Sequence, residues 1–298
     1  MYYSITAKKD ATIYERSASL NSGADEILEI QKVVSSSTTG DIYNSRVLIQ
    51  FDLTYISKSL VNGTITNPTY SLKLYTTKAQ GISYKYGLEA FAVSQSWEPG
   101  IGRTQTKKVS AGGALTFEEE GVSWQYRDGK TQYGIEWPTS SLMPGGFAPG
   151  STGSFATTAG GGAWYTGSYY SGKRTYEYEQ TDVSINVTNI VENMLTGSHV
   201  STYIPNNGFI VLRSGSNQPG NIDEEKNSVN YGTLQFFSTE THTIYQPRLV
   251  VSWDDSSFNP GSLTALDISK DNMLYIKNKR KGYPVNSRER FRVIGREK

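Results

Sequence analysis

The chain has 298 residues, of which 36% are hydrophobic and 19% are charged, and its formal net charge at pH 7 is +1. Its 21 tyrosines and 29 glycines are accompanied by no cysteine, which excludes disulfide bonds, thiolate nucleophiles and cysteine-ligated zinc. No apolar run reaches the roughly 18 to 20 residues that a membrane-spanning helix needs, so we expect no membrane segment.

Most of the chain consists of short alternating runs separated by Gly, Asn, Pro and Ser. Tyr70, Leu72 and Leu74, for example, fall on one face of a run, which is typical of a half-buried strand. At least eight strands without long helices between them predict antiparallel sheets packed face to face. The predicted strands are 27–31, 46–53, 70–75, 88–93, 184–187, 209–213, 234–238 and 248–253.

Two short helices are predicted among these strands, at residues 53–60 and 189–195. The second would cross one end of the sandwich. Residues 139–175 differ from their surroundings, because 21 of these 37 residues are Gly, Ser or Thr. This composition predicts a long flexible insertion within the first domain.

The C-terminal part of the chain is basic. Residues 277–298 contain nine Lys or Arg and two Asp or Glu, whereas the remaining residues carry a net charge of −6. We expect a linker at 254–263 and a basic β-arm at 264–298 with two short strand-like runs, 274–277 and 290–294. Because two strands cannot bury a core, this segment would dock on the main domain, add strands to a partner, or open a further domain.

The order of several motifs is more informative than any one of them. These motifs are Asn44–Leu53 (N-S-R-V-L-I-Q-F-D-L), Trp97-Glu98, Val122-Ser123-Trp124, Ser238-Thr239-Glu240 and Pro247-Arg248-Leu249. Over about residues 5–253 the chain resembles the DNRLRE-type β-sandwich family, jelly-roll modules found in secreted carbohydrate-binding proteins, surface proteins and tailed-phage virion proteins. The resemblance implies an all-β fold, with residues 1–253 as an antiparallel jelly-roll β-sandwich. It also implies fold-defining roles for Arg46, Phe51, Trp97, Trp124, Glu240 and Pro247.

The chain departs from the family pattern in its long insertion and its basic extension, and its first ten residues lack the pattern of a secretory signal. Together these features favour a non-enzymatic structural protein of a tailed-bacteriophage virion, located in the extracellular particle. Its partners would be other virion proteins and copies of itself. The residues of the assembly arm would be Lys277, Lys279, Arg280, Lys281, Arg288, Arg290 and Arg292.

An alternative function is a carbohydrate-binding module that recognises host-surface polysaccharide. Such modules need exposed aromatic rings that stack on sugar, together with polar groups that bind its hydroxyls. The candidate rings, which we expect in or beside loops, are Trp137, Trp164, Tyr165, Tyr169 and Tyr170. The competing interpretation, which we favour, is that these rings attach the long loop to the sandwich or to a neighbouring subunit.

Other kinds of site are less well supported. Structural calcium would suit Asp10, Asn21, Asp25 or the run 223–225, but none has the spacing of a calcium-binding loop, so we expect no metal or other cofactor. A nucleic acid partner is not expected, because Glu289 interrupts the basic arm and its aromatic residues are spaced for a strand.

Catalysis is also not expected from the sequence. The carboxylates of the run 118–120 would alternate between the two sides of a strand instead of forming a pair across a cleft. The two histidines, His199 and His242, are 43 positions apart and offer little material for a catalytic or metal site.

Overall fold

The protein is described from a computed structural model, which divides the chain into two compact units, Met1–Asp255 and Ser256–Lys298. The boundary lies within the predicted linker. The structure describes residues 1–35, 41–105, 108–109, 115–116, 120–129, 134–138, 155–158, 160–177, 182–195, 202–213, 223–226, 228–254, 272–277, 282 and 292–297.

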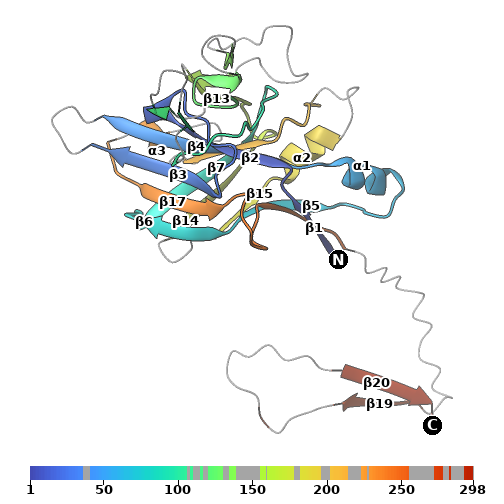
Figure 1. The fold of residues 1–298 in the computed structure, drawn as a ribbon. Coiled ribbons are helices and arrows are strands. Elements are labelled where there is room, and N and C mark those ends of the chain that lie inside the picture. Colours follow the sequence, from blue (N-terminus) through green and yellow to red (C-terminus); the bar gives the residue numbers. More distant parts are fainter. Residues whose placement is uncertain are drawn as a thin grey trace. The chain divides into compact units, whose positions relative to one another are not determined.

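The first unit is built mainly from antiparallel strands (Figure 1). Its helical segments are η1 (Glu15–Ser17), α1 (Thr54–Val61), α2 (Thr188–Leu195) and α3 (Asp223–Lys226). Its strands are β1 (Tyr2–Thr6), β2 (Lys9–Tyr14), β3 (Ile27–Val34), β4 (Ile42–Gln50), β5 (Thr69–Leu74), β6 (Thr76–Gln80), β7 (Lys85–Ala92), β8 (Lys108–Val109), β9 (Leu115–Thr116), β10 (Tyr126–Asp128), β11 (Ile135–Glu136), β12 (Phe155–Thr158), β13 (Gly160–Tyr165), β14 (Ser171–Glu177), β15 (Val183–Asn186), β16 (Phe209–Arg213), β17 (Gly232–Phe237) and β18 (Arg248–Ser252).

Two of the sheets contain most of these strands. The smaller sheet has the order β1-β18-β5-β15, and the larger has the order β14-β7-β16-β4-β3-β17-β6, with β2 also paired to β4. All of the strand pairs are antiparallel. The predicted all-β class is therefore confirmed, and each of the eight predicted strands overlaps a strand of the structure.

The two sheets share one hydrophobic core. Val47 and Ile49 of β4 lie in it with Val211 of β16, and they pack in the same cluster as Leu72 of β5 and Leu249 of β18 from the smaller sheet. These positions alternate along their strands because successive side chains of a strand point to opposite faces. The alternating sequence pattern that predicts half-buried strands therefore identifies the residues on the face of the larger sheet that packs in the shared core.

The opposite face of the larger sheet is also buried. Leu48 of β4, Phe91 of β7 and Ile210 of β16 belong to a second cluster that is rich in tryptophan. The strands β4, β7 and β16 therefore have apolar residues at consecutive positions, as expected of strands covered on both faces. In Figure 1, β13 lies over the larger sheet on the side away from β5 and β15.

The strand β13 depends on three consecutive glycines at positions 160–162, whose φ angles are +90°, +83° and +96°. A Cβ atom at these positions would lie 2.6 Å from the carbonyl oxygen of Trp124, 2.5 Å from Nη1 of Arg46 and 2.6 Å from Cδ1 of Ile210, respectively. Glycine is thus required both by the left-handed backbone and by the close approach to the sheet.

This arrangement corrects the prediction of a flexible insertion at 139–175. Residues 160–165 form a buried strand, and residues 171–177 form an edge strand of the larger sheet. The Gly-rich composition of residues 160–162 reflects tight packing and not flexibility. Residues 139–154 and 159 lie outside the described residues.

The chain crosses from one sheet to the other between β1 and β2. The amide of Ala7 donates to the carbonyl of Pro247 beside the smaller sheet, and the next amide, that of Lys8, donates to the carbonyl of Gln50 in the larger sheet. A single extended segment therefore belongs to both sheets and joins them at one side.

Both predicted helices are confirmed. An Asp52 carboxylate oxygen accepts a hydrogen bond from the Thr54 amide at the start of α1, and the Asn186 side chain does the same for Thr188 at the start of α2. Such contacts satisfy amides that have no partner within a helix. Both helices place residues in the shared core, and in Figure 1 they lie at the same end of the unit. Among the described residues, no helix is long and apolar enough to cross a bilayer.

The second unit contains one described element, an antiparallel hairpin of β19 (Asn272–Lys277) and β20 (Arg292–Glu297). It corresponds to the two strand-like runs predicted in the basic arm.

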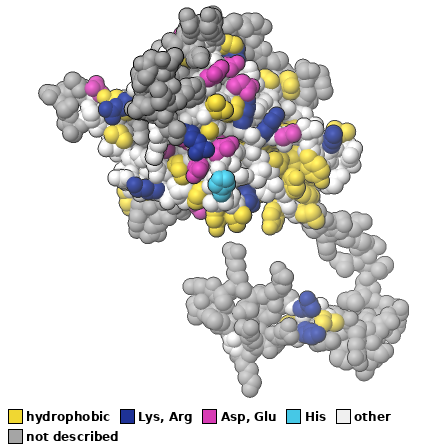
Figure 2. Space-filling model, in the orientation of Figure 1, with side chains coloured by type: hydrophobic (Ala, Val, Ile, Leu, Met, Phe, Trp, Pro, Cys, Tyr) yellow, Lys and Arg dark blue, Asp and Glu magenta, His cyan; other side chains and the backbone are white. Residues whose placement is uncertain are grey.

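On the face drawn in Figure 2, Lys and Arg side chains of the first unit are interspersed with Asp and Glu side chains.

Candidate functional site

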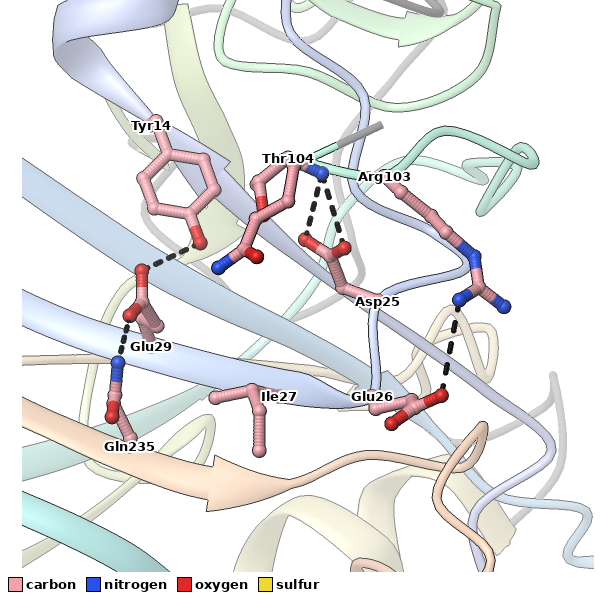
Figure 3. Close-up of a pocket in the computed structure, with 9 residues that line it drawn as sticks. Tyr14, Asp25, Glu26, Ile27, Glu29, Arg103, Thr104 and Gln235 are labelled. Atoms are coloured by element: carbon pink, nitrogen blue, oxygen red, sulfur yellow. Dashed lines mark hydrogen bonds and ion pairs between the residues drawn. The ribbon is translucent and has the colours of Figure 1, made fainter. Parts of the chain in front are cut away.

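A polar cavity of about 530 Å³ opens beside the end of β2 and the start of β3 (Figure 3). Its lining combines three carboxylates with one guanidinium, two amides and a phenol. The lining residues are Tyr14, Asp25, Glu26, Ile27, Glu29, Arg103, Thr104, Gln105 and Gln235.

Glu29 is held by two neighbouring side chains. In β3, Leu28 and Ile30 point into the core, so Glu29 between them points to the opposite face. One of its carboxylate oxygens accepts a hydrogen bond of 2.8 Å from the Tyr14 hydroxyl, and the other accepts one from the Gln235 amide. Gln235 is the direct cross-strand neighbour of Glu29 in β17.

The phenol of Tyr14 stays protonated at ordinary pH. Burial raises the pKa of Tyr14 well above its ordinary value, and the nearby carboxylate of Glu29 raises it further. Tyr14 therefore acts as a fixed hydrogen-bond donor that orients Glu29.

Asp25 and Glu26 form another part of the wall. Both carboxylate oxygens of Asp25 accept from the Thr104 amide, at 3.0 and 3.2 Å. Burial raises the pKa of Asp25, and the hydrogen bonds from Thr104 oppose this shift. At the rim, Nη1 of Arg103 lies 3.8 Å from Oε1 of Glu26, and both side chains are about half exposed.

The cavity presents hydrogen-bond acceptors to a ligand, with a few donors among them. Carboxylates accept hydrogen bonds from hydroxyl and amine groups, side-chain amides both donate and accept, and a guanidinium donates to hydroxyl oxygens. Convergent polar side chains of this kind fix the orientation of small polar ligands. The described lining contains no histidine, cysteine or lysine. The chemistry that the cavity offers is therefore directional hydrogen bonding.

The aromatic residues predicted to bind glycan occupy a different place. Trp137, Trp164, Tyr165 and Tyr170 are each at most 4% exposed, and only Tyr169, at 60%, is open to solvent. The expectation that these rings lie exposed in loops is wrong for four of the five.

The physical reason is that these four rings pack within the cores of the first unit. Trp164 packs against Phe91 with ring centroids 5.8 Å apart, and Tyr165 packs against Tyr170 at 5.4 Å. The indole N–H of Trp137 donates to the Ser123 carbonyl at 3.0 Å. No ring face of these residues is available to a sugar, which agrees with the interpretation that they attach their segments to the sheet.

The second core surrounds a buried ion pair. Nη2 of Arg46 lies 2.6 Å from Oε2 of Glu225, and both side chains are at most 3% exposed. The guanidinium also donates to the carbonyl of Gly161 and lies 4.6 and 5.0 Å from the ring centroids of Trp124 and Trp164. Arg46 therefore connects β4 to α3 and to the tryptophans above the sheet.

The other residues expected to define the fold are placed as follows. Phe51, Trp97 and Pro247 are buried, and the Trp97 indole N–H donates to the Asn207 carbonyl at 2.9 Å. Glu240 is exposed, and its backbone amide donates to the Ser238 hydroxyl. The Glu240 carboxylate therefore contributes nothing to the core.

The oxygen atoms considered as calcium ligands bind other parts of the chain. The Asp10 carboxylate accepts from the amide and hydroxyl of Thr239, and Asn21 bridges the loops around Pro99 and Gly102. Within run 223–225, one oxygen of Glu224 accepts from the Gly87 amide, and Glu225 pairs with Arg46. Within the described part of the chain, no three metal-ligating side chains come together.

The structure describes two residues of the predicted assembly arm. Lys277 of β19 lies directly opposite Arg292 of β20. The remaining arm residues, which lie outside the described residues, are Lys279, Arg280, Lys281, Arg288 and Arg290.

The residues weighed for catalysis are not brought into the cavity. Glu120 and His242 are exposed and do not line it. His199, Glu118 and Glu119 lie outside the described residues.

Sequence patterns point to only one residue of the cavity, Asp25. Glu29 occupies an outward position in an alternating strand. Most solvent-exposed strand residues occupy such positions, so the pattern does not distinguish Glu29 from them. Arg103 and Thr104 belong to a loop that no pattern connects to β3. Comparison with known proteins adds no relative, because no protein-family model and no curated protein matches the chain.

Proposed function

We propose that the protein is a non-enzymatic structural and assembly protein of a tailed-bacteriophage virion, in which a jelly-roll body is held to neighbouring subunits by loop contacts and by its C-terminal arm. The observation that carries this proposal is the separate C-terminal unit with its two-stranded hairpin. The virion setting rests on the sequence resemblance of residues 5–253 together with the basic C-terminal extension, in which the chain departs from the family pattern.

A two-stranded hairpin is marginally stable by itself in water. In this hairpin the cations Lys277 and Arg292 also lie directly opposite each other, which disfavours the pairing further. An acidic partner surface would neutralise this repulsion and cover the strands. The hairpin is therefore better suited to binding a neighbour than to standing alone.

The charge distribution of the chain indicates where such a neighbour could be found. Residues 277–298 carry nine basic and two acidic side chains, and the rest of the chain has a net charge of −6. Opposite charges of this kind steer association and fix its register. The arm of one subunit and the body of another are thus electrostatically complementary.

Deletion of residues 257–298 tests the proposal. The expected result is a folded body that is no longer incorporated into particles, measured by mass spectrometry of purified virions. A finer variant, Lys277→Glu with Arg292→Glu, should reduce incorporation, whereas the charge-conserving pair Lys277→Arg with Arg292→Lys should not. Undiminished incorporation of the deleted chain would reject the role of the arm.

A second candidate function is carbohydrate binding, and the observation that favours it is the polar cavity around Glu29. Sugar hydroxyls need acceptors such as Asp25 and Glu29 and donors such as Arg103. A glycan array followed by calorimetry should then detect binding that Glu29→Gln weakens at least about tenfold, the loss expected of a hydrogen bond to a charged group. The control Asp52→Asn alters an exposed carboxylate at the start of α1 and should bind normally. Silence on the array, or equal binding by both variants, would count against this function.

A further inference from the structure

Among the described residues, the smaller sheet ends in β1, which pairs with a neighbouring strand on one side alone. The ladder between β1 and β18 fixes which groups point outward. The Trp253 amide donates to the Met1 carbonyl at 3.0 Å, and the Ala7 amide donates to the Pro247 carbonyl at 3.0 Å. Hydrogen-bonded pairs recur at every second residue of an antiparallel ladder, so the odd-numbered residues of β1 bond to β18.

The backbone N–H and C=O groups of Tyr2, Ser4 and Thr6 consequently point away from β18. Within the described chain, β18 is the only strand paired with β1. The outer edge of β1 is thus a row of main-chain donors and acceptors with which another strand could pair.

Two other edge strands of these sheets are protected. The edge strand β15 is covered by β14, whose Arg174 guanidinium donates to the Ser184 carbonyl and whose Tyr176 hydroxyl accepts from the Ser184 amide. The edge strand β6 carries the charged Lys78 and an irregular register with β17. Charges and irregularities of this kind block unwanted pairing of edge strands.

By contrast, the sequence of β1 is Tyr-Tyr-Ser-Ile-Thr, without charge, proline or glycine. On one face of β1, the ring of Tyr3 lies 5.2 Å from that of Tyr55, and these side chains are 42% and 59% exposed. On the other face of the strand, Tyr2 is 76% exposed. Figure 2 shows exposed hydrophobic side chains gathered on the side of the unit where Figure 1 places α1 and the N-terminus.

We infer that β1 pairs antiparallel with β1 of a second copy of the chain across a twofold axis, which would join the two smaller sheets into one. A twofold contact requires a surface that complements itself. With the axis at Ser4, the outward groups of Ser4 face those of Ser4 in the other copy, and Tyr2 faces Thr6. Each such pair exchanges two bonds, which gives about six main-chain hydrogen bonds.

The side chains also favour this register. In it, Tyr2 lies directly opposite a β-branched residue, Thr6, on the same face of the joined sheet, a cross-strand combination that stabilises antiparallel pairs. No charge from either strand opposes the contact. A second copy is therefore the partner whose edge matches in length, polarity and direction. This contact does not involve the C-terminal arm and stands independently of the arm's role.

The test is the mass of the full chain by sedimentation equilibrium over a range of concentrations, with variants that act on the free edge alone. The wild type should form a dimer. Tyr2→Lys with Thr6→Lys places two lysine pairs opposite each other and should raise the dissociation constant at least about tenfold. Ser4→Pro should do the same, because it removes an outward N–H that β18 does not use. The control Thr69→Lys adds a charge on β5 in the interior of the same sheet and should leave the dimer intact.

A charge-complementation experiment makes the test specific. Mixing the Tyr2→Lys, Thr6→Lys chain with a Tyr2→Glu, Thr6→Glu chain should restore a heterodimer. Hydrogen exchange of the Ser4 amide should slow as the wild-type concentration rises, whereas the Tyr3 amide, which bonds to β18, should be protected throughout. A wild type that stays monomeric would overturn the inference, as would a dimer that the edge variants leave unchanged or a Ser4 amide that is equally protected in the monomer. Deletion of residues 257–298 should not affect this dimer, so its outcome is separate from that of the arm.

Discussion

The body, residues 1–255, and the C-terminal hairpin are both antiparallel β-structure, but only the body buries both faces of its central strands. In β4, Val47 and Ile49 pack in the core shared with the smaller sheet, while Leu48 packs beneath the tryptophans. The hairpin consists of two strands, with Ile276 and Val293 exposed by 48% and 62%. The difference shows that regular hydrogen bonding suffices to define a strand, whereas stability depends on what covers its faces.

The largest effect should follow loss of the buried arginine. Arg46→Ala would leave Glu225 as an uncompensated buried charge and remove packing from Trp124, and should lower the free energy of unfolding by about 3 to 5 kcal/mol. Chemical denaturation would measure this loss in the free energy of unfolding. The matched control is Arg103→Ala, which breaks the half-exposed pair with Glu26 and should cost no more than about 1 kcal/mol. Equal losses in the two variants would refute the structural role of Arg46.

Removal of a buried ring should have an effect of similar or slightly smaller size. Trp164→Ala should destabilise the body by about 3 to 4 kcal/mol because it opens a cavity beside Phe91. Tyr169→Ala removes an exposed ring and should change stability by less than about 0.5 kcal/mol. If thermal unfolding showed Trp164→Ala to be harmless, the ring would have to be accessible, and the glycan-stacking hypothesis would regain support.

The pH dependence of stability should report on a buried carboxyl group. Burial raises the pKa of Asp10 to about 7, while hydrogen bonds from Thr239 oppose the shift. Between pH 4 and 7 the folded state thus binds more protons at Asp10 than the unfolded state does, and stability falls as the pH rises. We expect a decrease of roughly 3 kcal/mol over this interval in the wild type.

The control for this prediction is Asp10→Asn, which keeps an acceptor for Thr239 but cannot ionise. Its stability should depend less steeply on pH than that of the wild type over the same interval. Parallel pH profiles of the two proteins would show that Asp10 is not the group responsible.

The smallest effect on the body should come from the hairpin. Lys277→Glu with Arg292→Glu alters the second unit alone, so the melting temperature of the body should not change measurably. Differential scanning calorimetry of the full chain would check this expectation. A shift of several degrees would mean that the hairpin docks on its own body.

Sequence patterns predict the first core better than the second. Alternation identifies strands such as 70–75, because one face of the smaller sheet is polar and the other apolar. It cannot show that Leu48 and Ile210 lie under a cover built from distant segments. The glycines at 160–162 are an example, because glycine is needed there to avoid a clash with Trp124 and Arg46, which are far away in the sequence.

The candidate site is less predictable from the sequence than the first core. Asp25 attracts attention as a carboxylate near a turn, but its partner Thr104 is 79 positions away. Likewise, Glu29 meets Gln235 only through the pairing of β3 with β17. A single sequence gives no register between distant strands, so the cavity emerges only when the sheet is assembled.

Hydrogen exchange of the hairpin amides, compared between the free chain and purified particles, would show whether the arm is bound to a neighbour in the particle. If the arm is an assembly element, amides of residues 272–277 and 292–297 should exchange rapidly in the free chain and at least about 100-fold more slowly in particles, while core amides of β4 stay protected in both. Hairpin amides that exchange equally fast in both samples, or a chain absent from the particles, would contradict the account.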